Sequence, residues 1–246
     1  MRSLIARTVA FLGFAVLTAT IGFAQAPASA PAADPSGHWE GTVDVPGMPI
    51  AIEVDLTKNA AGALSGTFGQ PAQSVRGLPL TTVTADGRTV TFVLKAGPEH
   101  STFKGTLSED GKTMEGTLDQ AGRTMTFKVS RTGDAKVMAA PKSAPIAKEL
   151  EGTWDGTIDA GARQMRVILK MANQADGTAT GSIASPDGSG LEIPIGMTVK
   201  DKTLTVDVPS IGGSFVGTLN AEGTQLAGTW TQAAGSAPLV FKKAAK

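Results

Sequence analysis

The feature that most constrains the fold of this chain is a five-residue pattern that recurs four times in each half. It consists of an apolar residue, any residue, glycine, threonine or serine, and a second apolar residue. Successive glycines of the pattern are 25, 39 and 11 residues apart in the first half and 25, 36 and 11 apart in the second. This agreement indicates an internal duplication with one three-residue insertion or deletion. The glycines are Gly41, Gly66, Gly105, Gly116, Gly156, Gly181, Gly217 and Gly228.

The same pattern predicts β-strands. The two apolar residues and the glycine share one face only if the side chains alternate with a period of two. Other segments alternate in the same way, for example Met48 to Leu56, and turn dipeptides such as Asp86-Gly87 and Asp176-Gly177 separate them. About eight short-connected strands per half predict an antiparallel meander. We therefore expect an all-β protein made of two tandem eight-stranded antiparallel up-and-down barrels, with two β-sandwiches as the alternative.

The N-terminal sequence predicts export. Residues 1–24 combine Arg2 and Arg7 with an uncharged apolar run that ends at Gly22-Phe23-Ala24, which is typical of a cleaved signal peptide. An uncleaved membrane anchor is the alternative. After it we expect a disordered tether (25–36), a first barrel (37–132), a linker (133–147) and a second barrel (148–246). We expect a periplasmic or secreted protein without a membrane span after signal cleavage.

The composition argues against most chemistry. Basic and acidic residues number 22 each, which gives no excess charge to attract nucleic acid. The chain has no cysteine, only His38 and His100 as histidines, and no Gly-x-Ser-x-Gly motif. Asp187 and Glu192 flank a glycine-rich stretch that favours a turn over a calcium site. We therefore expect no enzymatic activity, no catalytic residue, no metal ion and no cofactor.

Two resemblances extend this picture. The Gly-x-Trp motif that opens each copy, at Trp39 and Trp154, resembles that of the calycins, the lipocalin and avidin group. This resemblance implies that each tryptophan plugs one end of its barrel. It also implies that a basic residue of the last strand, Arg131 or Lys243, packs on the ring.

Each copy as a whole resembles the non-catalytic domain that precedes some secreted bacterial α/β-hydrolases. The shared features include Leu78-Pro79 or Ile193-Pro194 and, in the second copy, Gly-Thr-Leu-Asn at 217–220 and Gly-Thr-Trp-Thr-Gln at 228–232. The second copy fits better than the first. No hydrolase sequence follows it here, so the resemblance implies a module without the enzyme.

Comparison of the two copies predicts where a ligand would bind. Several inward positions are smaller in the second copy, which indicates a filled first barrel and an apolar cavity in the second. A second barrel that is merely narrower is the alternative. We expect a carrier of a small apolar ligand, or else a module that binds a periplasmic protein as an accessory or inhibitor. The predicted pocket residues are Ala179, Ile183, Val206, Phe215 and Trp230.

Overall fold

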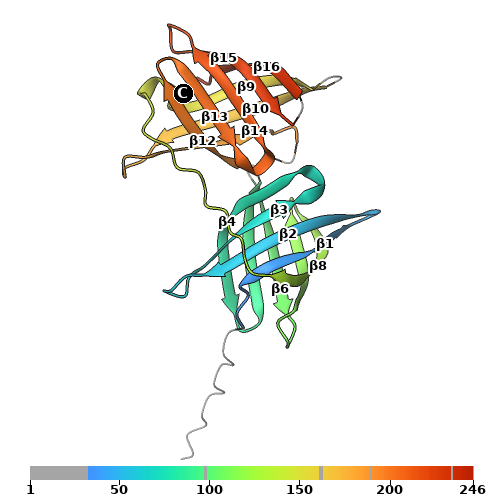
Figure 1. The fold of residues 1–246 in the computed structure, drawn as a ribbon. Helices are drawn as coiled ribbons and strands as arrows, with labels where there is room; N and C mark the ends of the chain where they lie inside the picture. Colours follow the sequence, from blue (N-terminus) through green and yellow to red (C-terminus); the bar gives the residue numbers. More distant parts are fainter. Residues whose placement is uncertain (1–32, 97–98, 161–162, 189, 234, 246) are drawn as a thin grey trace, which may run out of the picture. The chain divides into compact units, whose positions relative to one another are not determined.

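The computed structural model describes residues 33–246 apart from 97–98, 161–162, 189, 234 and 246. Each copy of the duplicated sequence folds into a closed barrel of eight antiparallel strands (Figure 1). The prediction of two tandem up-and-down barrels is confirmed, and the β-sandwich alternative is excluded. The predicted signal peptide lies outside the described residues. Among those described, no helix is long and apolar enough to cross a membrane.

Short connections join the strands of both barrels. The first barrel consists of β1 (Gly37–Val45), β2 (Met48–Lys58), β3 (Leu64–Gln70), β4 (Val75–Asp86), β5 (Thr89–Ala96), β6 (Glu99–Leu107), β7 (Thr113–Gln120) and β8 (Arg123–Gly133). The second consists of β9 (Gly152–Ala160), β10 (Arg163–Asn173), β11 (Ala179–Ala184), β12 (Ile193–Lys200), β13 (Thr203–Val208), β14 (Gly213–Leu219), β15 (Gln225–Gln232) and β16 (Gly235–Lys243). Three 3-10 turns complete the fold: η1 (Pro71–Gln73), η2 (Lys148–Leu150) and η3 (Pro209–Ile211).

The last strand of each barrel returns to the first. Val43 of β1 lies opposite Phe127 of β8, and Ile158 of β9 lies opposite Leu239 of β16. Closure pairs the first and last strands of each barrel, and the alternating apolar side chains point into each interior. All six phenylalanines of the described residues belong to these two cores.

The pattern glycines allow neighbouring strands to approach closely. Gly105 and Gly116 lie directly opposite each other on β6 and β7, as do Gly217 and Gly228 on β14 and β15. A Cβ atom placed on Gly116 would lie 2.0 Å from the carbonyl oxygen of Lys104. Glycine is therefore required there because the backbone of the adjacent strand occupies the space of a side chain.

One end of each barrel is closed by a buried tryptophan. Trp39 and Trp154 are both 0% exposed. Each donates its indole Nε1–H to a carbonyl oxygen four residues earlier, at Pro35 and Leu150, with a length of 2.9 Å in both cases. The expected cation–π contacts are both present: the guanidinium carbon of Arg131 lies 4.7 Å from the Trp39 ring centroid, and Lys243 Nζ lies 5.3 Å from that of Trp154.

Part of the predicted tether contacts the first barrel. Arg131 donates hydrogen bonds to the carbonyl oxygens of Asp34 and Ser36, and the amide of Ala33 donates to Gly87. These bonds, together with the one from Trp39, order residues 33–36 against the barrel end. The proposed tether is therefore limited to the residues that precede them.

The segment between the barrels is attached at several points. The amide of Lys136 donates to Asp55 of β2, and Met138 packs against Gly77 of β4. Further along, Ser143 pairs with Ala179 of β11, and Ile146 is buried in the second core. The predicted linker thus contacts both barrels, and the described residues belong to one compact unit.

Candidate functional site

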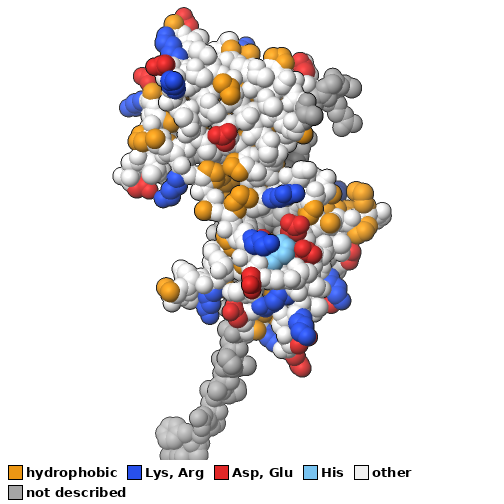
Figure 2. All heavy atoms as spheres, viewed as in Figure 1, with side chains coloured by type: hydrophobic (Ala, Val, Ile, Leu, Met, Phe, Trp, Pro, Cys, Tyr) orange, Lys and Arg blue, Asp and Glu red, His pale blue; other side chains and the backbone are white. Residues whose placement is uncertain are grey.

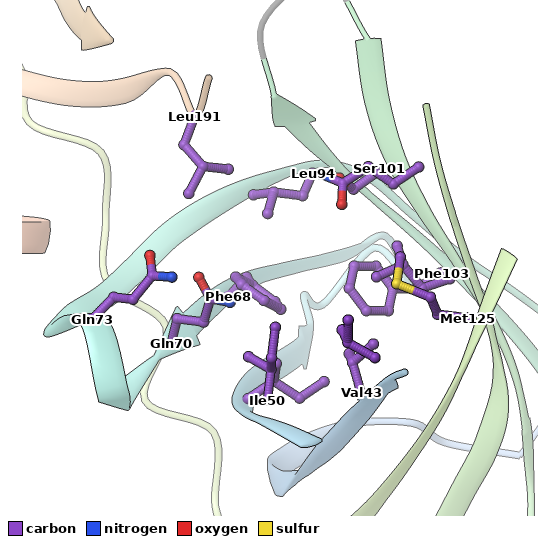
Figure 3. Close-up of a pocket in the computed structure, with 14 residues that line it drawn as sticks. Val43, Ile50, Phe68, Gln70, Gln73, Leu94, Ser101, Phe103, Met125 and Leu191 are labelled. Carbon is purple, nitrogen blue, oxygen red and sulfur yellow. The ribbon is translucent and has the colours of Figure 1, made fainter. Parts of the chain in front are cut away.

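A cavity of about 210 Å³ opens at the end of the first barrel opposite Trp39 (Figure 3). The strand order places it there: Trp39 lies near the start of β1, whereas the lining residues Val43 and Val45 lie near its end. The lining residues are Val43, Val45, Ile50, Ile52, Phe68, Gln70, Gln73, Leu94, Ser101, Phe103, Leu118, Gln120, Met125 and Leu191.

The cavity has an apolar interior and several polar groups. The rings of Phe68 and Phe103 lie 5.7 Å apart between their centroids. Gln70 and Gln73 lie together on one side of the opening in Figure 3, and each amide can both donate and accept hydrogen bonds. None of the lining residues carries an ionisable side chain. Because burying an unpaired charge is costly, this lining suits a neutral molecule with a polar end.

One residue of the lining comes from the second barrel. Leu191 lies in the connection between β11 and β12, is 7% exposed, and belongs to the core cluster of the first barrel. Figure 3 shows its side chain directed toward the cavity. Ile193 and Ile211 of the second barrel also pack against the first core.

An ion-pair network lies next to Leu191. The carboxylate of Glu192 receives Lys95 Nζ of the first barrel at 2.6 Å and Lys170 Nζ of the second at 2.7 Å. Partial burial acts to raise the pKa of Glu192, but hydrogen bonds from Lys170 and Lys95 outweigh it and lower the pKa below its usual value. The carboxylate therefore stays ionised at neutral pH and joins the two barrels through one side chain.

The pocket residues predicted from the sequence lie in the core of the second barrel. Ala179, Ile183, Val206, Phe215 and Trp230 are between 0 and 8% exposed and belong to one cluster. None of them lines the cavity in the first barrel. A pocket around these five residues stays a prediction.

A tryptophan explains why the open ends of the two barrels differ. In the first barrel Leu118 lies opposite Phe103, and in the second Trp230 lies opposite the equivalent Phe215. The Trp230 ring lies against Gly213, where a Cβ atom would come within 2.6 Å of the indole. The larger ring takes up space that stays open beside Leu118. This exchange was visible in the sequence, where Trp230 stands in the place of Leu118.

His38 is the centre of a polar cluster on the outer face of the first barrel. Its Nδ1 lies 2.8 Å from Asp55 Oδ1 and its Nε2 lies 3.1 Å from Glu40 Oε1. Desolvation acts to lower the pKa of His38, but the two carboxylates outweigh it and raise the pKa above 6.5. Both ring nitrogens face carboxylates, so neither is directed at a hydroxyl nucleophile. Among the described residues, no three acidic or histidine side chains gather in a way that could hold a metal ion.

Comparisons with known proteins leave the family open. No family model matches the sequence, and no curated protein matches it. A Bacteroides fragilis protein provisionally assigned to the outer membrane is 12% identical, over 85% of this chain and 97% of its own, with a TM-score of 0.25. A Nostoc punctiforme protein of unknown function from the DUF3598 family is 11% identical, over 85% and 96%, with the same TM-score.

A third solved structure is transferrin-binding protein B, isotype 1, of Neisseria meningitidis serogroup B. It is 12% identical over 79% of this chain and 52% of its own, again with a TM-score of 0.25. Scores this low support no inference about this chain. The resemblance to the domain that precedes α/β-hydrolases stays a prediction.

Proposed function

We propose that this chain is an exported, non-enzymatic binding protein whose first barrel carries a small, neutral, mainly apolar molecule. The cavity opposite Trp39 supports this proposal, because it is ligand-sized, apolar inside and supplied with amide groups. The arginine-containing apolar N-terminus supports export.

The size of the cavity limits the ligand. A volume of about 210 Å³ corresponds to roughly seven water molecules at about 30 Å³ each. A molecule of about seven to twelve non-hydrogen atoms would fill it, with the larger ones extending into the opening. At about 0.5 to 0.7 kcal/mol per atom, within the known range for small ligands, the dissociation constant would lie roughly between millimolar and micromolar.

The two phenylalanines and the glutamines indicate the shape of the ligand. Phe68 and Phe103 offer aromatic surface to a flat or branched apolar body. Gln70, Gln73 and Gln120 offer hydrogen bonds to a hydroxyl, carbonyl or amide at the ligand's other end. A phenol or a short-chain alcohol or amide has this arrangement of groups.

A second candidate function is protein binding, and one observation favours it. Met48 at the tip of the β1–β2 hairpin is 64% exposed. It lies two residues from Ile50, which lines the cavity. Figure 2 shows hydrophobic side chains gathered at this tip. Exposed apolar surface of this kind often marks a contact with a partner.

The test uses 1-naphthol, an uncharged phenol of suitable size, titrated into the protein by isothermal calorimetry. We expect saturable binding at one site. Leu118→Trp, which introduces the residue found in the second barrel, should weaken binding by at least about tenfold. Thr117→Trp places the same side chain on the outer face of the same strand and should leave binding unchanged.

Two results would contradict the proposal. The wild-type protein could show no saturable binding of 1-naphthol or of other neutral phenols, which would favour the protein-binding alternative. Leu118→Trp could also bind as tightly as the wild type, which would place the ligand outside this cavity.

A further inference from the structure

The cavity of the first barrel is completed by the second barrel. Leu191, which supplies part of its lining, is nearly fully buried against the first core. Ile193 and Ile211 also pack against the first core, so the contact between the barrels is apolar. A ligand that enters the first barrel therefore meets a side chain of the other copy.

The backbone next to Leu191 is held by charge. Glu192 follows it directly, and its side chain is 16% exposed. It bridges Lys95 of β5 and Lys170 of β10, one lysine from each barrel. Charge-assisted hydrogen bonds to a largely buried carboxylate are stronger than those of an exposed ion pair. The network therefore favours one position of the backbone next to Leu191 relative to the first barrel.

The equivalent end of the second barrel differs in the side chains that line it. Its open end contains the Trp230 ring packed against Gly213, and Trp230 is 8% exposed. The two copies thus differ in the side chains at their open ends, and the second copy provides part of the wall of the cavity in the first.

We infer that the second barrel acts as a specificity element for the first: Leu191 limits the length of the ligand, and Glu192 with its two lysines positions Leu191. This inference rests on the proposed binding function and adds the residues that select among ligands. It also gives the duplication a role, because a single barrel would lack this wall.

A series of 4-alkylphenols from methyl to hexyl tests the inference in the full chain. Each buried methylene contributes about 0.8 kcal/mol, or roughly a fourfold gain in affinity. We expect the affinity of the wild type to rise along the series and then level off where the chain reaches Leu191. In Leu191→Ala the affinity should continue to rise for at least one further methylene. Leu191→Met, which keeps the volume, should behave like the wild type.

The role of the ion pairs is tested with Glu192→Gln. We expect the limit on the length of the alkyl chain to become less sharp, because Leu191 is held less firmly. The dissociation rate of the bound alkylphenol should rise by about threefold or more. In the wild type, raising the salt concentration to 1 M should also make the chain-length limit less sharp and raise the dissociation rate. Salt screens these ion pairs because Lys95 and Lys170 are partly exposed. Glu222→Gln, at an exposed glutamate of the second barrel, is the matched control and should change neither.

The outcomes separate this inference from the proposed function. If the wild type binds the phenols but Leu191→Ala levels off at the same chain length, the specificity role is wrong and the carrier function stands. If the wild type binds none of them, both are wrong. Thermal unfolding of each variant shows whether a change in binding reflects loss of the fold.

Discussion

The two glycines that face each other on β6 and β7 should differ in what they tolerate. A Cβ atom on Gly116 would lie 2.0 Å from the carbonyl oxygen of Lys104 and 2.6 Å from the Cα atom of Gly105, both backbone atoms of the adjacent strand. A Cβ atom on Gly105 would instead meet the side chains of Met114 at 2.6 Å and Phe127 at 2.9 Å. Side chains can turn aside, whereas a paired strand must move as a whole.

The cost of Gly116→Ala can be estimated from this geometry. Real Cβ atoms stay about 3.0 Å or more from other heavy atoms, so the strands would separate by roughly 1 Å. Such a shift would break one or two hydrogen bonds at about 1 kcal/mol each and add about 1–3 kcal/mol of packing strain. Alanine also lowers the conformational entropy of the unfolded chain, which offsets about 0.4–1 kcal/mol of this loss. We expect a net loss of about 2–4 kcal/mol for Gly116→Ala and less than about 2 kcal/mol for Gly105→Ala.

Urea unfolding followed by tryptophan fluorescence measures these differences, because Trp39 is the one tryptophan of the first barrel. Thr117→Ala, on the outer face beside Gly116, is the control and should cost no more than about 0.5–1 kcal/mol. In the second barrel Gly228, which also faces backbone atoms, provides an independent repeat of the Gly116 result. If Gly105→Ala costs as much as Gly116→Ala, the approach of the two backbones is not what requires glycine.

Three further predictions follow from the described contacts. Trp39→Ala should destabilise the first barrel by about 3–5 kcal/mol in urea unfolding followed by circular dichroism, because it empties a fully buried position, and a loss below about 1 kcal/mol would show that the ring does not close the barrel. His38→Gln should lower the free energy of unfolding by up to about 1 kcal/mol at pH 5 and by less at pH 8. Burial acts to lower the pKa of His38, but Asp55 and Glu40 outweigh it and raise the pKa. The stabilisation by His38 is therefore present below pH 6.5 and is lost as the pH rises through the folded-state pKa. Limited proteolysis of the connection between the barrels should first cleave at 139–142, between its contact with the first barrel at Lys136 and its contact with the second at Ser143. A first cut inside a strand would contradict this prediction.

Much of the fold could be predicted from the sequence because the repeated pattern carries several independent signals. The period of two gave the strands, the turn dipeptides separated them, and the spacing of the glycines revealed the duplication. The contacts of Arg131 and Lys243 with the two tryptophans came from a resemblance, and both are present. These features are local or are fixed by the order of the strands.

The candidate site was less predictable because it depends on where volumes lie in three dimensions. Adding up side-chain sizes along the sequence pointed to the second barrel, since several of its inward residues are smaller. Such a sum does not say where the volumes lie: Trp230 stands at the open end of the second barrel, where its ring packs against Gly213. Leu191 could not be assigned to the cavity at all, because only the packing of one barrel on the other brings it there.

The two ends of each barrel are under different constraints, and this explains where the copies diverge. The closed ends share the buried tryptophan, the 2.9 Å bond to a carbonyl four residues earlier and the cation above the ring. A change at any of these groups would leave a buried donor unpaired or a core position empty, so both copies need the same solution. At the open end the interior only needs to be either filled or matched to a ligand. Leu118 and Trp230 meet that requirement in different ways on one scaffold, and under the proposed function they would give the two copies different roles.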